Sequence, residues 1–99
     1  MKKHKDYFML PNKIFELELK PRDFIVYCCL IRHKDNDSHA CYPSRKLIAQ
    51  ECCITPRTVD KALANLQRLG MIHLQNRKRM NGSNTTNLYT VTVLLENAA

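Results

Sequence analysis

The sequence contains only two glycines among its 99 residues, and neither belongs to a glycine-rich phosphate-binding loop. Such a loop is part of the usual machinery for nucleotide hydrolysis, so its absence argues against that class of enzyme. Long apolar runs are missing as well. The longest, residues 24–31, has eight residues, whereas a membrane-spanning helix needs about 20. We therefore expect no membrane association and interpret this run as part of a buried helix.

The spacing of the five cysteines does not fit a zinc-binding pattern. They form two adjacent pairs and one isolated residue, no C-x-x-C occurs, and His33 and His39 do not complete a finger or ribbon motif. An odd number of cysteines without an export signal is typical of reduced thiols that act as small core hydrophobes. We therefore expect no metal and no other cofactor.

A catalytic constellation is also lacking. The four histidines are isolated, the His-x-His pattern of rolling-circle nucleases does not occur, and the nine acidic residues form no spaced pair on a segment expected to line a cleft. Cys29 and His33 share a helix face at i and i+4, but in a buried helix we interpret them as packing residues. The sequence therefore predicts a protein without enzymatic activity.

The first ten residues have a basic start but neither the apolar h-region nor the cleavage site of a signal peptide. We therefore expect a cytoplasmic protein. A length of 99 residues is enough for one core but not for two. We assign residues 1–99 to a single domain, with residues 1–7 flexible.

Positive charge is concentrated in the second half of the sequence. Residues 1–43 contain eight basic and six acidic side chains, whereas residues 44–84 contain eight basic and two acidic ones. The net charge of the two segments is therefore +2 and +6, and residues 85–99 contribute −1, which gives the total of +7. Such an excess in one segment is typical of a protein that binds a polyanion. The alternative is a basic face that only contacts solvent.

Pro21 in a first-turn position and Asp23 near the positive end of a helix dipole predict a helix over residues 21–33. Its apolar residues lie nearly all round, so this helix is expected to be central and buried. A short helical turn is expected before it, over residues 11–19, and a loop after it, over residues 33–40. The residues of the turn expected to face the core are Ile14, Phe15, Leu17 and Leu19.

Two more helices are predicted, joined by a three-residue turn over residues 53–55. Ser44 caps the first of them, Thr55 caps the second, and Gly70 ends it. Alternating strand-like runs then flank Asn81 and Gly82, which predicts a hairpin with a long basic tip. The fold class is therefore mainly α with a β-hairpin wing (α+β), in which a three-helix core includes a helix pair at about 44–69 and the wing spans about 71–93.

Three residues of the helix pair resemble the helix-turn-helix signature. Ala49 is the small residue where the two helices approach each other, and Cys53 is the turn residue. Val59 is the β-branched residue that anchors the third helix to the core. The signature usually has glycine in place of Cys53, because the turn there tends to need a positive φ. A cysteine in that conformation costs on the order of 1 kcal/mol. The alternative is a slightly reshaped turn.

The resemblance extends over about residues 8–93. Its more specific pieces are YPS (42–44), TPRTV (55–59) and NLYTV (87–91). With them the sequence resembles the winged helix-turn-helix domains of plasmid, phage and conjugative-element proteins, in which this domain often forms the front of a replication-initiation protein. The resemblance implies double-stranded DNA binding in replication or maintenance of a mobile element. Transcriptional regulators and transfer proteins use the same domain, and both roles are alternatives here.

The third helix of such domains meets base edges with its first two turns. Its predicted DNA-contacting residues are Thr55, Arg57, Thr58 and Lys61. Arg57 is suited to donate two hydrogen bonds to a guanine, whereas Lys61 suits a phosphate and Thr58 either group. The alternative for Arg57 is an ion pair with Asp60 or Glu51.

The start of the second helix and the hairpin tip are the other predicted DNA contacts. A helix N-terminus favours phosphate, although a serine there also serves as a simple cap. Cations on a hairpin tip are suited to reach the minor groove or the backbone, although basic tips are also common as soluble turns. The residues concerned are Ser44, Arg45 and Lys46 on the helix and Arg77, Lys78, Arg79 and Asn81 on the tip.

A second hypothesis is a protein-interaction module of a replication or transfer complex. It uses the edge of the long first helix and the apolar residues of the N-terminal segment. Those residues are Phe8, Leu10, Phe15 and Leu17. No dedicated dimerisation helix follows the wing, so we favour a monomer in solution.

Overall fold

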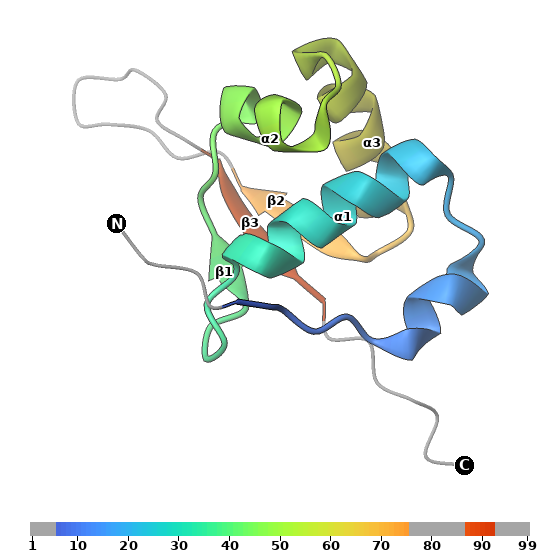
Figure 1. Ribbon diagram of the computed structural model, residues 1–99, viewed down its shortest axis with the longest axis vertical. Coiled ribbons are helices and arrows are strands. Elements are labelled where there is room, and N and C mark those ends of the chain that lie inside the picture. Colours follow the sequence, from blue (N-terminus) through green and yellow to red (C-terminus); the bar gives the residue numbers. More distant parts are fainter. Residues whose placement is uncertain (1–5, 76–86, 93–99) are drawn as a thin grey trace.

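The computed structural model describes residues 6–75 and 87–92, and its helices and strands are shown in Figure 1. A 3-10 helix, η1, precedes three α-helices and a small sheet. Their bounds are η1 Asn12–Leu17, α1 Pro21–His33, β1 Ala40–Cys41, α2 Arg45–Cys52, α3 Pro56–Arg68, β2 Ile72–Gln75 and β3 Leu88–Val91. The predicted fold is confirmed: it is a winged helix-turn-helix with a three-helix core.

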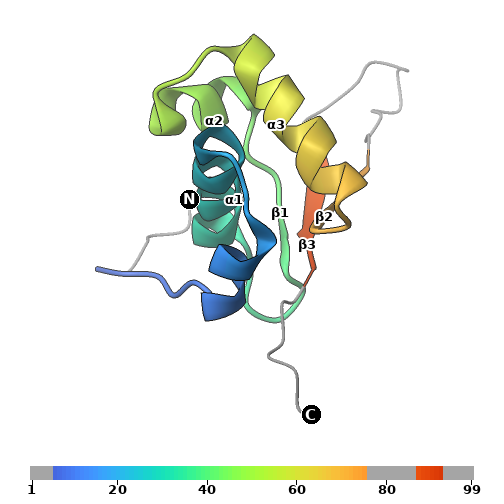
Figure 2. The same cartoon turned by 90° about the vertical axis from the view of Figure 1, so that its right-hand side faces the viewer.

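The sheet is antiparallel with strand order β1-β3-β2. β2 and β3 form the predicted hairpin, in which Ile72 pairs with Val91. β1 was not predicted, because residues 33–40 were expected to be a loop. It pairs Ala40 with Thr90 and Cys41 with Tyr89. In Figure 2 the helices α2 and α3 lie at one end of the molecule, and η1 lies at the other.

Helix α1 lies at the centre of the core, as predicted. Its residues Val26, Tyr27 and Leu30 are buried, and the helix packs against α2, α3 and β3. The prediction for η1 was only partly right. Ile14 is buried, but Phe15 is 73% exposed and packs on Phe24 in a tilted arrangement, with ring centroids 5.3 Å apart and ring planes at 49°. A 3-10 helix has three residues per turn, so neighbouring side chains point about 120° apart and cannot both face inward.

Helices α2 and α3 end in the same hydrogen-bonding pattern. After α3, Gly70 has φ +77°, and the N–H of Met71 donates to the carbonyl of Leu66 at 3.0 Å. After α2, Cys53 has φ +58°, and the N–H of Ile54 donates to the carbonyl of Ala49 at 3.1 Å. Both ends are therefore Schellman motifs with a left-handed residue. The turn keeps the conformation that usually takes glycine, and Cys53 adopts it.

Asp23 is buried, with a relative exposure of 0%. It was predicted only as a favourable charge in the first turn of α1. Its carboxylate accepts hydrogen bonds from Arg22 Nε at 2.9 Å and from the side-chain amide of Asn65 in α3. Asn65 also accepts from Arg68 through its amide oxygen. This polar contact joins the N-terminus of α1 to the second half of α3.

All five cysteines are free thiols, and four of them are buried. Burial raises the pKa of Cys41 to about 12, so this thiol stays protonated at neutral pH. The prediction of reduced core cysteines is consistent with this arrangement. Within residues 6–75 and 87–92, no helix has both the length and the hydrophobicity required to span a membrane.

Candidate nucleic-acid interface

Helix α3 presents a basic face away from the core. Val59, Ala62, Leu63 and Leu66 are its buried residues. Arg57 and Lys61, one turn apart, are exposed on the opposite side. Among the described residues Arg57 forms no ion pair, since Asp60 pairs with Arg45 and Glu51 with His33 and Arg32. The guanidinium is therefore directed to solvent and available to a ligand.

Sequence reasoning overlooked Ala64, which is exposed on the same side of α3. In a helix with 3.6 residues per turn, Ala64 falls between Arg57, Lys61 and Arg68 on one face. Its short side chain leaves the middle of this face open to close approach. The periodicity of the apolar stripe is the signal that identifies Ala64 as exposed, because every residue opposite the stripe is exposed.

Thr55 and Thr58 organise the first turn of α3. The Thr55 hydroxyl accepts a hydrogen bond from the N–H of Thr58 at 3.2 Å, which makes it the N-cap. The two hydroxyls also lie 2.9 Å apart and form a hydrogen bond with each other. Pro56 occupies the first helical position, where a missing N–H costs nothing. This local arrangement fixes the turn on which Arg57 stands.

The start of α2 lies beside the second turn of α3. Ser44 caps α2 by accepting from the N–H of Leu47 at 3.0 Å. Arg45 makes two hydrogen bonds of 2.6 Å to the carboxylate of Asp60, and these bonds raise the pKa of the Arg45 guanidinium. Lys46 is exposed next to this pair. The pair holds the N-terminus of α2 against α3, and both of its members are about half exposed to solvent.

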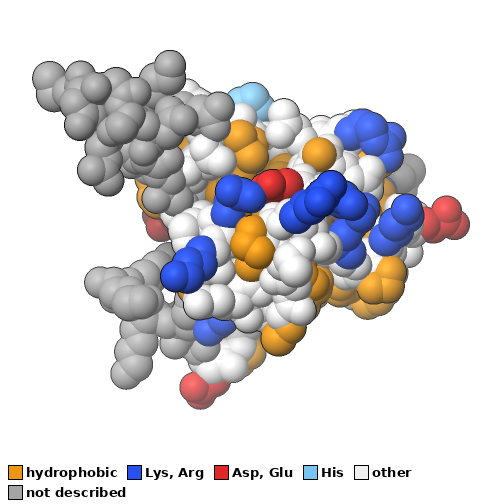
Figure 3. All heavy atoms as spheres, turned by 90° about the horizontal axis from the view of Figure 1, so that it is seen from above, with side chains coloured by type: hydrophobic (Ala, Val, Ile, Leu, Met, Phe, Trp, Pro, Cys, Tyr) orange, Lys and Arg blue, Asp and Glu red, His pale blue; other side chains and the backbone are white. Residues whose placement is uncertain are grey.

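Basic side chains outnumber acidic ones on the two helices of the motif. Figure 3 looks onto this end of the molecule and shows several Lys and Arg side chains around few acidic groups. From Ser44 to Gly70 the basic residues are Arg45, Lys46, Arg57, Lys61 and Arg68, and the acidic ones are Glu51 and Asp60. The local net charge is therefore +3, which favours a polyanionic ligand.

The predicted wing-tip contacts Arg77, Lys78, Arg79 and Asn81 lie outside the described residues. The strands that lead to and from this tip, β2 and β3, are described, and β2 packs against α3. The base of the wing is thus placed next to α3.

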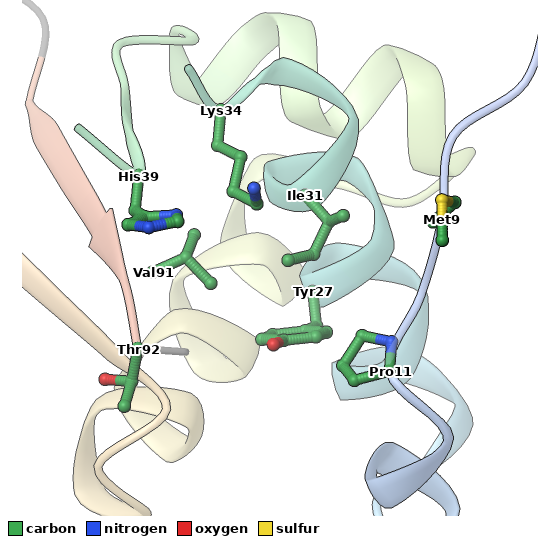
Figure 4. A pocket seen from close by; sticks show the side chains of 8 residues that line it. All are labelled: Met9, Pro11, Tyr27, Ile31, Lys34, His39, Val91 and Thr92. Atoms are coloured by element: carbon green, nitrogen blue, oxygen red, sulfur yellow. The ribbon is translucent and has the colours of Figure 1, made fainter. Parts of the chain in front are cut away.

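An apolar pocket of about 180 Å³ lies on another side of the molecule, between the N-terminal segment, α1 and β3. Figure 4 shows its walls, with Tyr27 and Ile31 from α1 facing Val91 from β3 and Met9 and Pro11 closing the N-terminal side. The remaining lining residues are Lys34, His39 and Thr92. Of the predicted DNA-contacting residues, none that the structure describes lines it.

The fold and the exposed basic face of α3 define a helix-turn-helix domain of the DNA-binding class. A family model described as a helix-turn-helix domain matches residues 17–72, more than half of the chain. The protein therefore belongs to this helix-turn-helix family, which supports DNA as its partner and DNA binding as its activity. No curated protein matches the sequence.

Proposed function

We propose that the protein binds double-stranded DNA sequence-specifically by inserting the N-terminal half of α3 into the major groove. The observation that carries this proposal is the exposed face of α3 with Arg57 and Lys61, on a chain of the helix-turn-helix family. In this class of protein two helices are joined by a short turn, and the second helix enters the major groove.

Arg57 reads a base in this proposal. Its planar guanidinium matches the O6 and N7 acceptors of guanine, and such a bidentate contact contributes about 1–3 kcal/mol of discrimination. Lys61, one turn later, contacts a phosphate as a flexible point charge. Thr55 and Thr58 keep their mutual hydrogen bond and offer the remaining hydroxyl capacity to the adjacent backbone or base.

The N-terminus of α2 holds a phosphate in this proposal. Ser44 and Lys46 lie at the helix end, where free N–H groups and the helix dipole favour an anion. Arg45 is bound to Asp60 without DNA. An exposed ion pair contributes little net free energy, so the guanidinium exchanges its carboxylate for a phosphate at small cost when DNA arrives.

Arg77, Lys78, Arg79 and Asn81 are proposed to contact the backbone or the adjacent minor groove from the wing. We further propose a cytoplasmic role in replication or maintenance of a mobile element, on the resemblance carried by YPS, TPRTV and NLYTV. Transcriptional regulation uses the same DNA chemistry at a different target site. Recovery and mapping of the chromosomal or plasmid DNA bound by the protein would distinguish these roles.

The base-reading role of Arg57 is tested with a duplex selected from a randomised pool and a scrambled duplex of equal length. Binding is measured by fluorescence anisotropy. Arg57→Ala should weaken binding to the selected duplex about 10- to 100-fold and binding to the scrambled duplex only a few-fold. Arg57→Lys is the matched control for charge: it keeps binding to scrambled DNA but loses most of the preference for the selected duplex.

Two results would contradict the proposal. If Arg57→Ala weakens both duplexes equally, Arg57 contacts only the backbone. If the wild-type protein binds no duplex even at low salt, DNA is not the ligand of this face.

A second candidate function, protein docking, is favoured by the apolar pocket and by exposed apolar residues of the N-terminal segment. Tyr7 and Met9 of the N-terminal segment are exposed, and Met9 also lines the pocket. Exposed apolar residues next to an apolar pocket are typical of a protein-binding surface. Met9→Asp should abolish such docking while leaving DNA binding unchanged, because the pocket lies apart from the basic face of α3.

A further inference from the structure

Three potential metal ligands from two helices meet beside the helix-turn-helix motif. The Cys29 thiol of α1 donates a hydrogen bond to Glu51 Oε1 of α2 at 3.3 Å, and His33 Nε2 of α1 lies 2.8 Å from the same oxygen. All three ligand atoms lie within 4.8 Å of one another. Cys29 and His33 are one turn apart on α1, so both side chains leave the helix on one side.

The two separations that involve Glu51 Oε1 are close to those of a tetrahedral metal site. With Zn–S of about 2.3 Å and Zn–N and Zn–O of about 2.0–2.1 Å, tetrahedral angles place neighbouring ligand atoms about 3.3–3.6 Å apart. The distance of 3.3 Å between the thiol and the carboxylate is only about 0.2 Å shorter than the roughly 3.5 Å of such a sulfur–oxygen pair. The distance of 2.8 Å between His33 and Glu51 needs to lengthen by roughly half an ångström, which small side-chain rotations provide.

We propose that Cys29, His33 and Glu51 form a binding site for a transition-metal ion of the Zn²⁺ class, with water in the fourth position. A thiolate, an imidazole and a carboxylate together are a donor set that such ions accept. The spacing of the sequence conceals this site, because Glu51 lies 22 residues after Cys29 and on another helix.

The charges of the site balance a divalent ion. A thiolate and a carboxylate supply two negative charges, and a neutral imidazole supplies none. Burial, with the hydrogen bond to Glu51 acting in the same direction, raises the pKa of the Cys29 thiol. The ion therefore displaces the thiol proton, which leaves to solvent as the S–metal bond forms. The same step removes the hydrogen bond that Cys29 donates to Glu51.

The site is reachable from solvent. The side chains of His33 and Glu51 are 16% and 22% exposed, whereas Cys29 is buried, with a relative exposure of 6%. Arg32 approaches the same carboxylate oxygen at 3.4 Å, and its side chain is 42% exposed. An ion thus enters past His33 and Glu51 and reaches the sulfur last. Once bound, it ties α1 to α2, the first helix of the DNA-binding motif.

The test uses the reduced full-length chain without a histidine tag, titrated with Co²⁺ as an optical probe and with Zn²⁺ in competition. We expect one equivalent to bind, with a thiolate-to-cobalt charge-transfer band and the intense visible bands of a tetrahedral site. Cys29→Ser should lose the charge-transfer band. Glu51→Gln and His33→Gln should weaken Co²⁺ binding at least about tenfold, since even outer-shell substitutions reach that size.

Cys28→Ser is the matched control, because Cys28 is the neighbouring buried cysteine of α1 and is not part of the cluster. It should keep the charge-transfer band. X-ray absorption of the Zn²⁺-loaded wild-type protein should show one sulfur ligand among nitrogen and oxygen, and this measurement does not depend on variants that fold. Absence of binding at micromolar metal, a site without sulfur, or an unchanged spectrum in Cys29→Ser would overturn the proposal and leave a hydrogen-bond network only.

Discussion

Cys53 and Gly70 perform the same structural task with different side chains. Each follows a helix in the left-handed region, with φ +58° for Cys53 and φ +77° for Gly70. A Cβ atom in this region clashes with the neighbouring peptide, at about 1–2 kcal/mol. The turn of the helix-turn-helix motif is therefore strained at Cys53, whereas the end of α3 is not strained at Gly70.

This difference predicts opposite effects of two substitutions. Cys53→Gly should raise the free energy of unfolding by up to about 1 kcal/mol, because it removes the strain at a small cost in backbone entropy. Gly70→Ala should lower it by about 1 kcal/mol. An added Cβ at Gly70 meets no other atom within 4 Å, so the loss comes from the backbone conformation alone. Urea denaturation followed by circular dichroism measures both effects.

Cys53→Ala is the control for the cysteine side chain. It keeps the Cβ atom and thus the strain, and Cys53 is exposed, so stability should change by less than about 0.5 kcal/mol. If Cys53→Ala stabilises as much as Cys53→Gly, the thiol rather than the backbone is the source of the effect.

At the scale of elements, α1 and α3 are joined by one buried polar contact. Asp23 of α1 is buried and accepts hydrogen bonds from Asn65 of α3 and from Arg22. A buried carboxylate is stable only while its partners are present. The orientation of α3, and with it of Arg57, therefore depends on a contact at the opposite end of the helix.

We expect a large loss of stability when this contact between Asp23 and Asn65 is removed. Asp23→Ala should lower the free energy of unfolding by about 2–3 kcal/mol, since it leaves the half-buried Asn65 amide without its charged acceptor. For a domain of this size, that corresponds to a fall in Tm of about 10 °C or more. Asn65→Ala should have a similar cost, and the double variant should cost less than the sum. Additive costs in calorimetry would show that the two side chains act independently.

The sequence predicted the elements whose signals are local. Pro21, Ser44 and Thr55 each mark a helix start within one turn of chain, and the starts of α1, α2 and α3 are confirmed. β1 has only two residues, and its partner strand lies about 50 residues further along the chain. No local pattern marks such a strand. The burial of Asp23 has the same cause, because its partner Asn65 is 42 residues away.

The features of the candidate site also fall into two groups: those that local sequence predicts and those that depend on long-range packing. The exposed position of Arg57 and Lys61 follows from the period of the apolar stripe on α3. The pairing of Arg45 with Asp60 depends on how α2 crosses α3, and the meeting of Cys29 with Glu51 depends on how α1 crosses α2. Helix crossings are set by packing across the whole core, so one stretch of sequence does not determine them. The DNA contacts themselves stay predictions.

At the scale of the molecule, the cations of the proposed DNA surface come from two parts of the chain. The described part contributes Arg45, Lys46, Arg57 and Lys61 from α2 and α3, and the sequence adds Arg77, Lys78 and Arg79, which are the predicted contacts of the wing tip. Each phosphate that these cations neutralise releases a counterion from the duplex. The affinity for any DNA sequence should therefore depend steeply on salt concentration.

The last prediction concerns this salt dependence. A plot of log affinity against log salt concentration should have a slope of roughly −4 to −6, which corresponds to about five or six phosphate contacts. Lys78→Ala should reduce the slope by about 1 and weaken all sequences similarly, because a wing lysine meets phosphate rather than a base. Alanine at Arg77, Lys78 and Arg79 together should reduce the slope by about 3, with the preference for the selected duplex retained.

The control for net charge is Lys13→Ala. It removes the same charge as Lys78→Ala, but from η1 at the opposite end from α2 and α3 (Figure 2). An equal loss of slope in Lys13→Ala and Lys78→Ala would mean that net charge, and not contact by the wing, governs the affinity.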